Sequence, residues 1–231
     1  MMNPYLQPLK ALFESAANPA QAVPMKKYMR NQFEFLGIKR PFQQALFKQF
    51  LAEYGLPELF QVEEVVQELW RWPEREYQYA ALMFLDKQQK RLTPDMLSCL
   101  EDLITTKSWW DTVDSIASHN VGKLLRQYPA SRDDVINRWR DTENLWLRRT
   151  TLLFQLGYKA ETDERLLFSL VEENRDSLEF FIQKAIGWAL REYSKTAPKA
   201  VQAFVSKTTL APLSEREALK WLKAKGNIKS I

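Results

Sequence analysis

A seven-residue helical segment recurs along the chain at a fixed interval. It reads Tyr79-Ala-Ala-Leu-Met-Phe-Leu, then Asp114-Ser-Ile-Ala-Ser-His-Asn, then Arg149-Thr-Thr-Leu-Leu-Phe-Gln, then Lys184-Ala-Ile-Gly-Trp-Ala-Leu, with starts 35 residues apart. Each copy lies in the second helix of a predicted helix pair, and this period is typical of an α-solenoid of the HEAT or armadillo kind. Because stacked pairs curve, we expect Asp114, Arg149 and Lys184 to line one concave face.

The rest of the chain has the same helical character. Only 6 of 231 residues are glycine, which disfavours Rossmann folds and tight hairpins. Apolar residues follow the helical period from end to end, and no segment alternates as a strand does. The predicted helices include 22–32, 74–88, 108–126, 143–157 and 177–195. No low-complexity linker interrupts them, so we predict an all-α superhelix of HEAT-like repeats, as a single domain over 1–231.

Three segments resemble a helix-capping box. They are Ser108-x-x-Asp111, Ser131-Arg132-Asp133-Asp134 and Ser214-Glu215-Arg216-Glu217. The spacing gives Asp111 a local structural role at the start of its helix, whereas Asp114 lies too far along to cap. A different reason is needed for a carboxylate at Asp114.

Composition and charge exclude several kinds of protein. The formal net charge is +4, which permits binding to a phosphate backbone without requiring it. One cysteine (Cys99) and one histidine (His119) exclude an internal disulfide framework and zinc sites built from Cys and His. No signal pattern opens the chain, and no apolar run approaches the roughly 20 residues of a membrane span. We therefore expect a cytoplasmic protein with no membrane contact. The sequence shows no sign of a metal or organic cofactor, and we expect a monomer, as solenoids that wrap DNA can be.

The segment Ser108-Trp109-Trp110-Asp111-Thr112-Val113-Asp114 carries the strongest chemical signal. On a helix, Trp110 and Asp114 share one face, while Trp109 and Val113 share another. One face can enter the core while the other presents an aromatic ring beside a carboxylate. That pairing suits a flat, apolar, positively charged ligand. A purine alkylated on N3 or N7 is such a ligand.

Aromatic and basic residues also alternate on two later helices. Arg148 and Arg149 follow Trp146, while Lys184, Trp188 and Arg191 share one side of a helix. Cations beside rings on a concave surface are typical of a nucleic-acid cradle. The alternative is that the tryptophans belong to the core and the arginines to a solvated surface, which is the commoner arrangement in helical proteins.

Taken together, the motifs resemble those of the AlkD-like alkylpurine DNA glycosylases, also called DNA alkylation repair enzymes. The resemblance spans residues 3 to 225 and is carried by Tyr28-Met-Arg-Asn-Gln-Phe-x-Phe-Leu-Gly-Ile38, Lys107-Ser-Trp-Trp-Asp-x-Val-Asp114, Trp146-x-x-Arg149-x-x-x-Leu-Phe-Gln155 and Lys184-Ala-Ile-Gly-Trp-Ala-Leu-Arg-Glu192. It implies a superhelix of HEAT-like repeats with a basic concave face that binds DNA.

The resemblance also implies roles for single residues. Asp114 matches the catalytic carboxylate, and Trp110 and Trp188 match aromatic residues that contact the lesion-bearing nucleotide. Tyr28 matches a tyrosine near the same cleft, and Arg149 matches an arginine that binds the DNA backbone. From the alternation of basic and aromatic residues, we add a second group to the DNA-binding set: Arg148, Lys184 and Arg191.

These observations predict a monofunctional glycosylase. Its partner is double-stranded DNA carrying N3-methyladenine or N7-methylguanine, and its products are free base and an abasic site. Two alternatives stay open. A non-catalytic HEAT-like protein could bind branched or bent DNA, and many α-solenoids are protein–protein scaffolds.

Overall fold

The computed structural model describes residues 3–226. All the regular elements assigned in that range are helices. The one extended pairing there is an isolated bridge between Glu34 and Glu74. Contacts divide the chain into two compact units, Met1–Cys99 and Leu100–Ile231. The predicted all-helical fold is confirmed, while the single domain over 1–231 stays a prediction.

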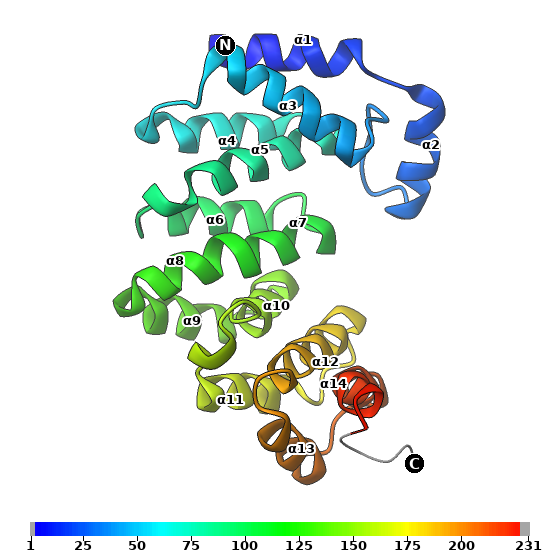
Figure 1. The fold of residues 1–231 in the computed structure, drawn as a ribbon, viewed down its shortest axis with the longest axis vertical. Coiled ribbons are helices and arrows are strands. Elements are labelled where there is room, and N and C mark those ends of the chain that lie inside the picture. Colours follow the sequence, from blue (N-terminus) through cyan, green and yellow to red (C-terminus); the bar gives the residue numbers. More distant parts are fainter. Residues whose placement is uncertain (1–2, 227–231) are drawn as a thin grey trace. The chain divides into compact units, whose positions relative to one another are not determined.

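The first unit is built from helix pairs around an aromatic core. Helix α1 packs on α3, and α4 packs on α5 (Figure 1). The rings of Phe47 and Phe50 both meet Phe84 edge-on, with centroids 4.8 and 6.2 Å apart. Its α-helices are α1 (Gln7–Ser15), α2 (Pro19–Tyr28), α3 (Arg40–Tyr54), α4 (Val62–Arg71) and α5 (Arg75–Gln88), and α6 (Met96–Thr105) crosses the boundary between units.

The second unit stacks its helix pairs one after another. Helix α10 packs against α9 and α12, and α12 packs against α14 (Figure 1). The elements are α7 (Trp110–Ser115), η4 (Ile116–Val121), α8 (Gly122–Gln127), α9 (Arg132–Arg140), α10 (Leu145–Leu153), α11 (Glu164–Asn174), α12 (Phe180–Ser194), α13 (Pro198–Lys207) and α14 (Pro212–Ala224). Asp114, Arg149 and Lys184 lie on α7, α10 and α12, the second helices of successive pairs, so the HEAT-like repeat is confirmed here.

The predicted helix 108–126 departs from regular α geometry in its middle. It consists of α7, a π-helical turn over Ile116–Val121, and α8. Wide turns of this kind are rare and are found mostly as short insertions within α-helices, often at functional sites. The turn begins two residues after Asp114, whose carbonyl accepts a hydrogen bond of 2.7 Å from the Ser118 hydroxyl.

The predicted helix 22–32 ends too late. Helix α2 stops at Tyr28, because Arg30 and Asn31 have positive φ angles of 52° and 57°. A right-handed helix cannot continue through the left-handed region, although asparagine enters that region more readily than most residues. Tyr28 is therefore the last residue of its helix and not an interior one.

None of the three predicted capping boxes forms. Ser131 is the N-cap of α9, but its side chain makes no capping hydrogen bond. Trp109 is the N-cap of α7, and the Ser108 hydroxyl donates to the Ile104 carbonyl at 2.6 Å. Ser214 lies inside α14, where its hydroxyl donates to the Gln183 carbonyl of α12 at 2.9 Å. The Ser108 partner lies four residues earlier in the chain, whereas the Ser214 partner is a carbonyl that the fold brings close. The spacing alone did not reveal this.

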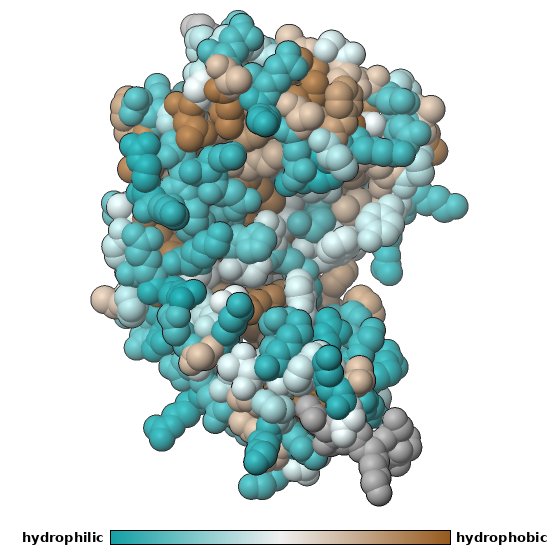
Figure 2. Space-filling view, in the orientation of Figure 1, coloured by the Kyte–Doolittle hydropathy of each residue, from teal (hydrophilic) through white to brown (hydrophobic). Residues whose placement is uncertain are grey.

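Polar side chains dominate the visible surface of the second unit, which is mainly teal and white in Figure 2. The apolar residues of its helices are instead buried, as with Leu153, Ile186 and Leu190, each fully inaccessible to solvent. This is the division that amphipathic helices produce when their apolar faces meet. Among residues 3–226, no helix is long and apolar enough to cross a membrane.

Candidate active site

A cavity of about 390 Å³ opens within the second unit. Four helices contribute to its wall: α7, α10, α12 and α14. Its lining residues are Trp110, Asp114, Arg149, Phe180, Phe181, Lys184, Trp188, Arg191 and Glu217. Six of the eight residues predicted as site residues therefore meet in one place, although they are spread over about 80 positions of sequence.

Asp114 and Arg149 form a two-pronged ion pair at this cavity. The Arg149 Nε donates to Oδ1 of Asp114 at 2.7 Å, and Nη2 donates to Oδ2 at 2.8 Å. The third guanidinium nitrogen, Nη1, donates to the backbone carbonyl of Phe181. Paired parallel bonds of this kind fix the carboxylate plane as well as its charge. Asp114 is therefore held in one orientation by α10 and α12.

Burial and ion pairing act on Asp114 in opposite directions. Its side chain is 14% exposed and that of Arg149 is 4% exposed. Desolvation by the surrounding protein raises the pKa of the Asp114 carboxyl above its ordinary value, while the hydrogen bonds and charge of Arg149 oppose that rise. Asp111, one turn earlier on α7, adds a smaller upward effect on the same pKa.

An aromatic cluster lies around the Arg149 guanidinium. Arg149 sits over the Phe181 ring, 5.8 Å from its centroid. Phe181 in turn contacts Trp109 and Trp146, with centroids 5.2 and 5.0 Å away. The face of an aromatic ring attracts a cation, and packed rings restrict its movement. Trp109 therefore packs behind the ion pair through Phe181, in keeping with its predicted place on a different face from Trp110.

Trp110 and Trp188 are half-buried and both line the cavity. Trp110 lies one helical turn before Asp114 on α7, so its ring and that carboxylate border the same space. Trp188 lies one turn after Lys184 on α12. The tryptophans are therefore not plain core residues, and each leaves part of its ring open to a ligand.

Lys184 and Arg191 converge on a carboxylate that the sequence did not reveal as part of the site. Lys184 Nζ donates to Oε1 of Glu217 at 3.0 Å, and Arg191 Nη1 donates to Oε2 at 2.6 Å. The charge and hydrogen bond of Lys184 lower the pKa of Glu217, and Arg191 adds to that effect. The sequence placed Glu217 in a capping box, a role that its spacing fits and the fold does not use.

The approach of α14 to α12 depends on Gly187. A Cβ atom at this position would lie 2.5 Å from the Cβ of Glu217 and 2.9 Å from the carbonyl oxygen of Ser214. Any side chain would therefore push the two helices apart. Glycine lets α14 come close enough for the Glu217 carboxylate to reach both cations.

Two predicted residues are not among those that line this cavity. Arg148 does not line the cavity, and its Nε and Nη2 donate to Oδ1 of Asn174 at 3.1 and 2.7 Å. Tyr28 belongs to the first unit, at the end of α2, with 71% of its surface exposed. The DNA-binding roles assigned to Arg148 and Tyr28 stay predictions.

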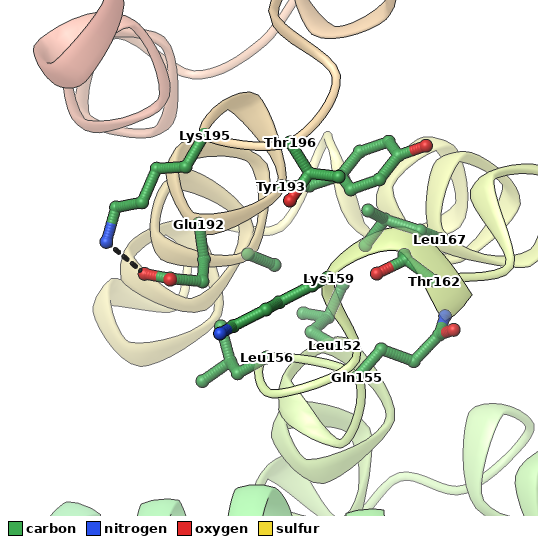
Figure 3. Close-up of a pocket in the computed structure, with 11 residues that line it drawn as sticks. Leu152, Gln155, Leu156, Lys159, Thr162, Leu167, Glu192, Tyr193, Lys195 and Thr196 are labelled. Carbon is green, nitrogen blue, oxygen red and sulfur yellow. Dashed lines mark hydrogen bonds and ion pairs between the residues drawn. The ribbon is translucent and has the colours of Figure 1, made fainter. Parts of the chain in front are cut away.

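A second, smaller cavity of about 210 Å³ lies on another side of α12. Leu152, Leu156 and Leu167 line it together with Lys159, whose side chain extends along the opening in Figure 3. None of the predicted site residues borders it. Across residues 3–226, no cluster of three or more His, Cys, Asp or Glu side chains could hold a metal ion.

The arrangement can be compared with known proteins. A family model described as DNA alkylation repair enzyme matches residues 9–222, nearly the whole chain and all four helices of the site. This chain belongs to the DNA alkylation repair enzyme family.

A solved structure agrees with that membership. It is described as a predicted DNA alkylation repair enzyme from Enterococcus faecalis. Its sequence is 35% identical to the present chain, and the two structures match with a TM-score of 0.83. The similarity covers 89% of this chain and 96% of the other. No curated protein matches the sequence. Family membership supports a role in alkylation repair, with DNA as the partner.

Proposed function

We propose that the protein is a DNA glycosylase that releases positively charged alkylated purines from duplex DNA. The observation that carries this proposal is the oriented Asp114 carboxylate beside Trp110, Trp188 and an open cavity. Family membership supports a role in alkylation repair. The reaction hydrolyses the N-glycosidic bond and leaves a free base and an abasic site.

The chemistry of the lesion decides what the protein must supply. Alkylation at N3 of adenine or N7 of guanine places a positive charge on the base, which then leaves as a neutral molecule. The enzyme therefore does not need a strong acid. Its main task is to stabilise the sugar as positive charge develops at C1′. An ionised carboxylate fixed in position does this without reorganising during the reaction.

Asp114 fits this task in its charge and its orientation. The Arg149 guanidinium donates two hydrogen bonds to the carboxylate, which favours the ionised form of Asp114. Asp114 would stabilise the developing charge and position or deprotonate the attacking water. Arg149 would act on the reaction through Asp114, because its guanidinium is buried and three of its five N–H groups already have partners.

The other cavity residues would hold the nucleotide. Trp110 and Trp188 would pack against the deoxyribose and attract its partial positive charge. Lys184 and Arg191 would bind phosphates and set the register of the duplex. A Schiff-base step requires a neutral amine. The Lys184 ammonium is instead paired with Glu217, which supports a monofunctional enzyme.

The test is base release from a duplex with a single N7-methylguanine, read as strand scission at the abasic site after alkali. Asp114→Asn is measured in parallel, with Asp141→Asn as a matched control on an exposed side chain of the same unit. We expect release by the wild type and the control, and a loss of about 10²–10³-fold in Asp114→Asn, typical of removing one electrostatic stabiliser.

Other outcomes point elsewhere. A folded Asp114→Asn variant with the wild-type rate would show that the carboxylate is not catalytic. No release by any variant, with salt-dependent binding retained, would favour a non-catalytic protein that binds DNA structure. Neither release nor affinity for duplex DNA would favour a protein–protein scaffold.

A further inference from the structure

Glu217 lies in the proposed active site without a role in the mechanism above. It is the cavity's second carboxylate, and it comes from α14, the last helix of the described chain. Asp114 borders the same cavity but is paired with a different cation, Arg149. The two acidic groups therefore belong to separate ion clusters, and the second one needs its own explanation.

In the second cluster, one carboxylate bridges two cations of the same helix. Lys184 and Arg191 are seven residues apart on α12, which places them on the same side of the helix and about two turns apart. The carboxylate of Glu217 bridges this interval, because each of its oxygens accepts from one cation. Glu217 therefore restrains two long, flexible side chains at the same time.

Exposure shows which groups of the cluster face outward. The side chains of Lys184 and Arg191 are 38% and 27% exposed, whereas that of Glu217 is 15% exposed. The carboxylate therefore lies beneath the cations. A lysine ammonium has three N–H groups and an arginine guanidinium five, and the bonds to Glu217 use one on each. Donors remain for an anion arriving from the solvent side.

We propose that Glu217 is a positioning residue that holds Lys184 and Arg191 as a two-point clamp for the DNA backbone beside the lesion. This inference rests on the proposed glycosylase function. Preorganisation matters because a small displacement of a bound substrate from its reactive geometry costs much of the rate. By fixing the cations before DNA arrives, Glu217 sets where the sugar lies relative to Asp114.

The surrounding packing is suited to this task. Gly187, between Lys184 and Arg191 on α12, allows α14 to approach closely, and the Ser214 hydroxyl ties α14 to the Gln183 carbonyl. These contacts set the position of the Glu217 backbone independently of DNA. A carboxylate that merely competed with phosphate would not need such support or such low exposure.

The test is a double-mutant cycle on excision. The single-turnover rate constant at saturating protein is measured on an N7-methylguanine duplex for Glu217→Gln, Lys184→Met and the double variant, and again with Arg191→Met. We expect Glu217→Gln to slow excision about tenfold. Because Glu217 acts through both cations, each double variant should lose less than the product of its two single losses. Multiplicative losses in both cycles would overturn the proposal.

Binding and rescue separate positioning from a merely structural role. Glu217→Gln should bind undamaged duplex at least as tightly as the wild type, since the negative charge that neutralises part of the two cations is lost. Tighter binding at an unchanged excision rate would overturn the proposal and make Glu217 a competitor of phosphate. Glu217→Asp keeps the charge and should recover part of the rate, even if Glu217→Gln folds poorly, and no recovery in a folded Glu217→Asp would also contradict the proposal. Glu215→Gln, on an exposed side chain of α14, is the matched control.

Failure of the glycosylase proposal would be visible separately. If the wild type released no base, that function would fail, and the same cycles would be scored on the affinity for undamaged duplex. Coupling between Glu217 and Lys184 or Arg191 in that affinity would retain the clamp. Additive effects in both cycles would remove it.

Discussion

The two ion clusters of the cavity use similar groups in different environments. In the first, Asp114 and Arg149 are almost removed from solvent, with 14% and 4% of their side chains exposed. In the second, Glu217 lies beneath two cations that are 38% and 27% exposed. Desolvation raises the pKa of Asp114, while Lys184 lowers the pKa of Glu217. Burial therefore sets the direction of the pKa shift in the first cluster, and neighbouring positive charge sets it in the second.

This difference suggests a division of labour. A buried carboxylate held by one arginine exerts its charge in a medium that screens it weakly, which suits stabilisation of a transition state. A carboxylate beneath exposed cations leaves those cations free to meet a phosphate. The largest expected effects therefore concern the first cluster, and the smaller ones concern the second.

Asp114→Asn should destabilise the protein more than any single substitution in the second cluster. It leaves the Arg149 guanidinium buried without its counter-charge, and we expect the free energy of unfolding to fall by about 3 kcal/mol. Combining it with Arg149→Met should recover much of that loss, because both charges are then absent. Urea unfolding of the two single variants and the double variant measures this. A double variant that loses the sum of both single losses would contradict the account.

The decrease of the excision rate at acid pH should follow the protonation of Asp114. Since the ionised form is active and its pKa is raised, the rate should fall with acid through a midpoint above about 3.9, the ordinary value for a free aspartate. Arg149→Lys loses the two-pronged pair and should move that midpoint to higher pH. A midpoint unchanged in folded Arg149→Lys would argue against Asp114 as the titrating group.

Gly187→Ala should disrupt the second cluster and leave the first intact. The added Cβ would overlap Glu217 and Ser214, and overpacking of this kind costs about 1–3 kcal/mol in the free energy of unfolding. Excision should slow as Glu217 moves away from the cations. Gly157→Ala is the matched control, because an added Cβ there meets nothing within 4 Å. Equal effects of the two substitutions would contradict the proposed packing role.

The smallest effect expected is on the pH dependence of stability in Glu217→Gln. The pKa of Glu217 is lowered in the folded protein, so its ionised form adds stability above the ordinary glutamate value and loses that contribution as pH falls through the folded value. Thermal unfolding should therefore separate wild type from Glu217→Gln near neutral pH and converge in acid. A gap that widens in acid would reverse the sign of the predicted linkage.

Much of the fold could be predicted from local patterns. The predicted helix 177–195 corresponds to α12, which spans Phe180–Ser194, because apolar residues at helical spacing mark a buried face wherever the helix packs. Deviations arise where the backbone changes conformation, as at Arg30 and Asn31 or in the π-turn after Asp114. No periodic signal in the sequence marks those positions.

The candidate site could be predicted in part for a similar reason. The shared face of Trp110 and Asp114 follows from helix geometry, so the pairing of a ring and a carboxylate needed no tertiary information. The partners of Arg148 and Glu217, by contrast, could be found only from the tertiary structure. Arg148 precedes Arg149 by one residue and therefore points to a different side of α10, where it meets Asn174.

Local sequence patterns account for most of the helices, for the 35-residue repeat and for the residues that each helix presents on one face. These properties belong to a single helix and follow from its 3.6-residue turn. The pairing of charges depends instead on how the helices pack: Arg149 pairs with Asp114, and Lys184 and Arg191 pair with Glu217. The paired residues lie on different helices and are 26 to 35 positions apart in the sequence. Their meeting depends on ångström-scale packing, such as the close approach at Gly187, which the spacing within one helix does not reveal.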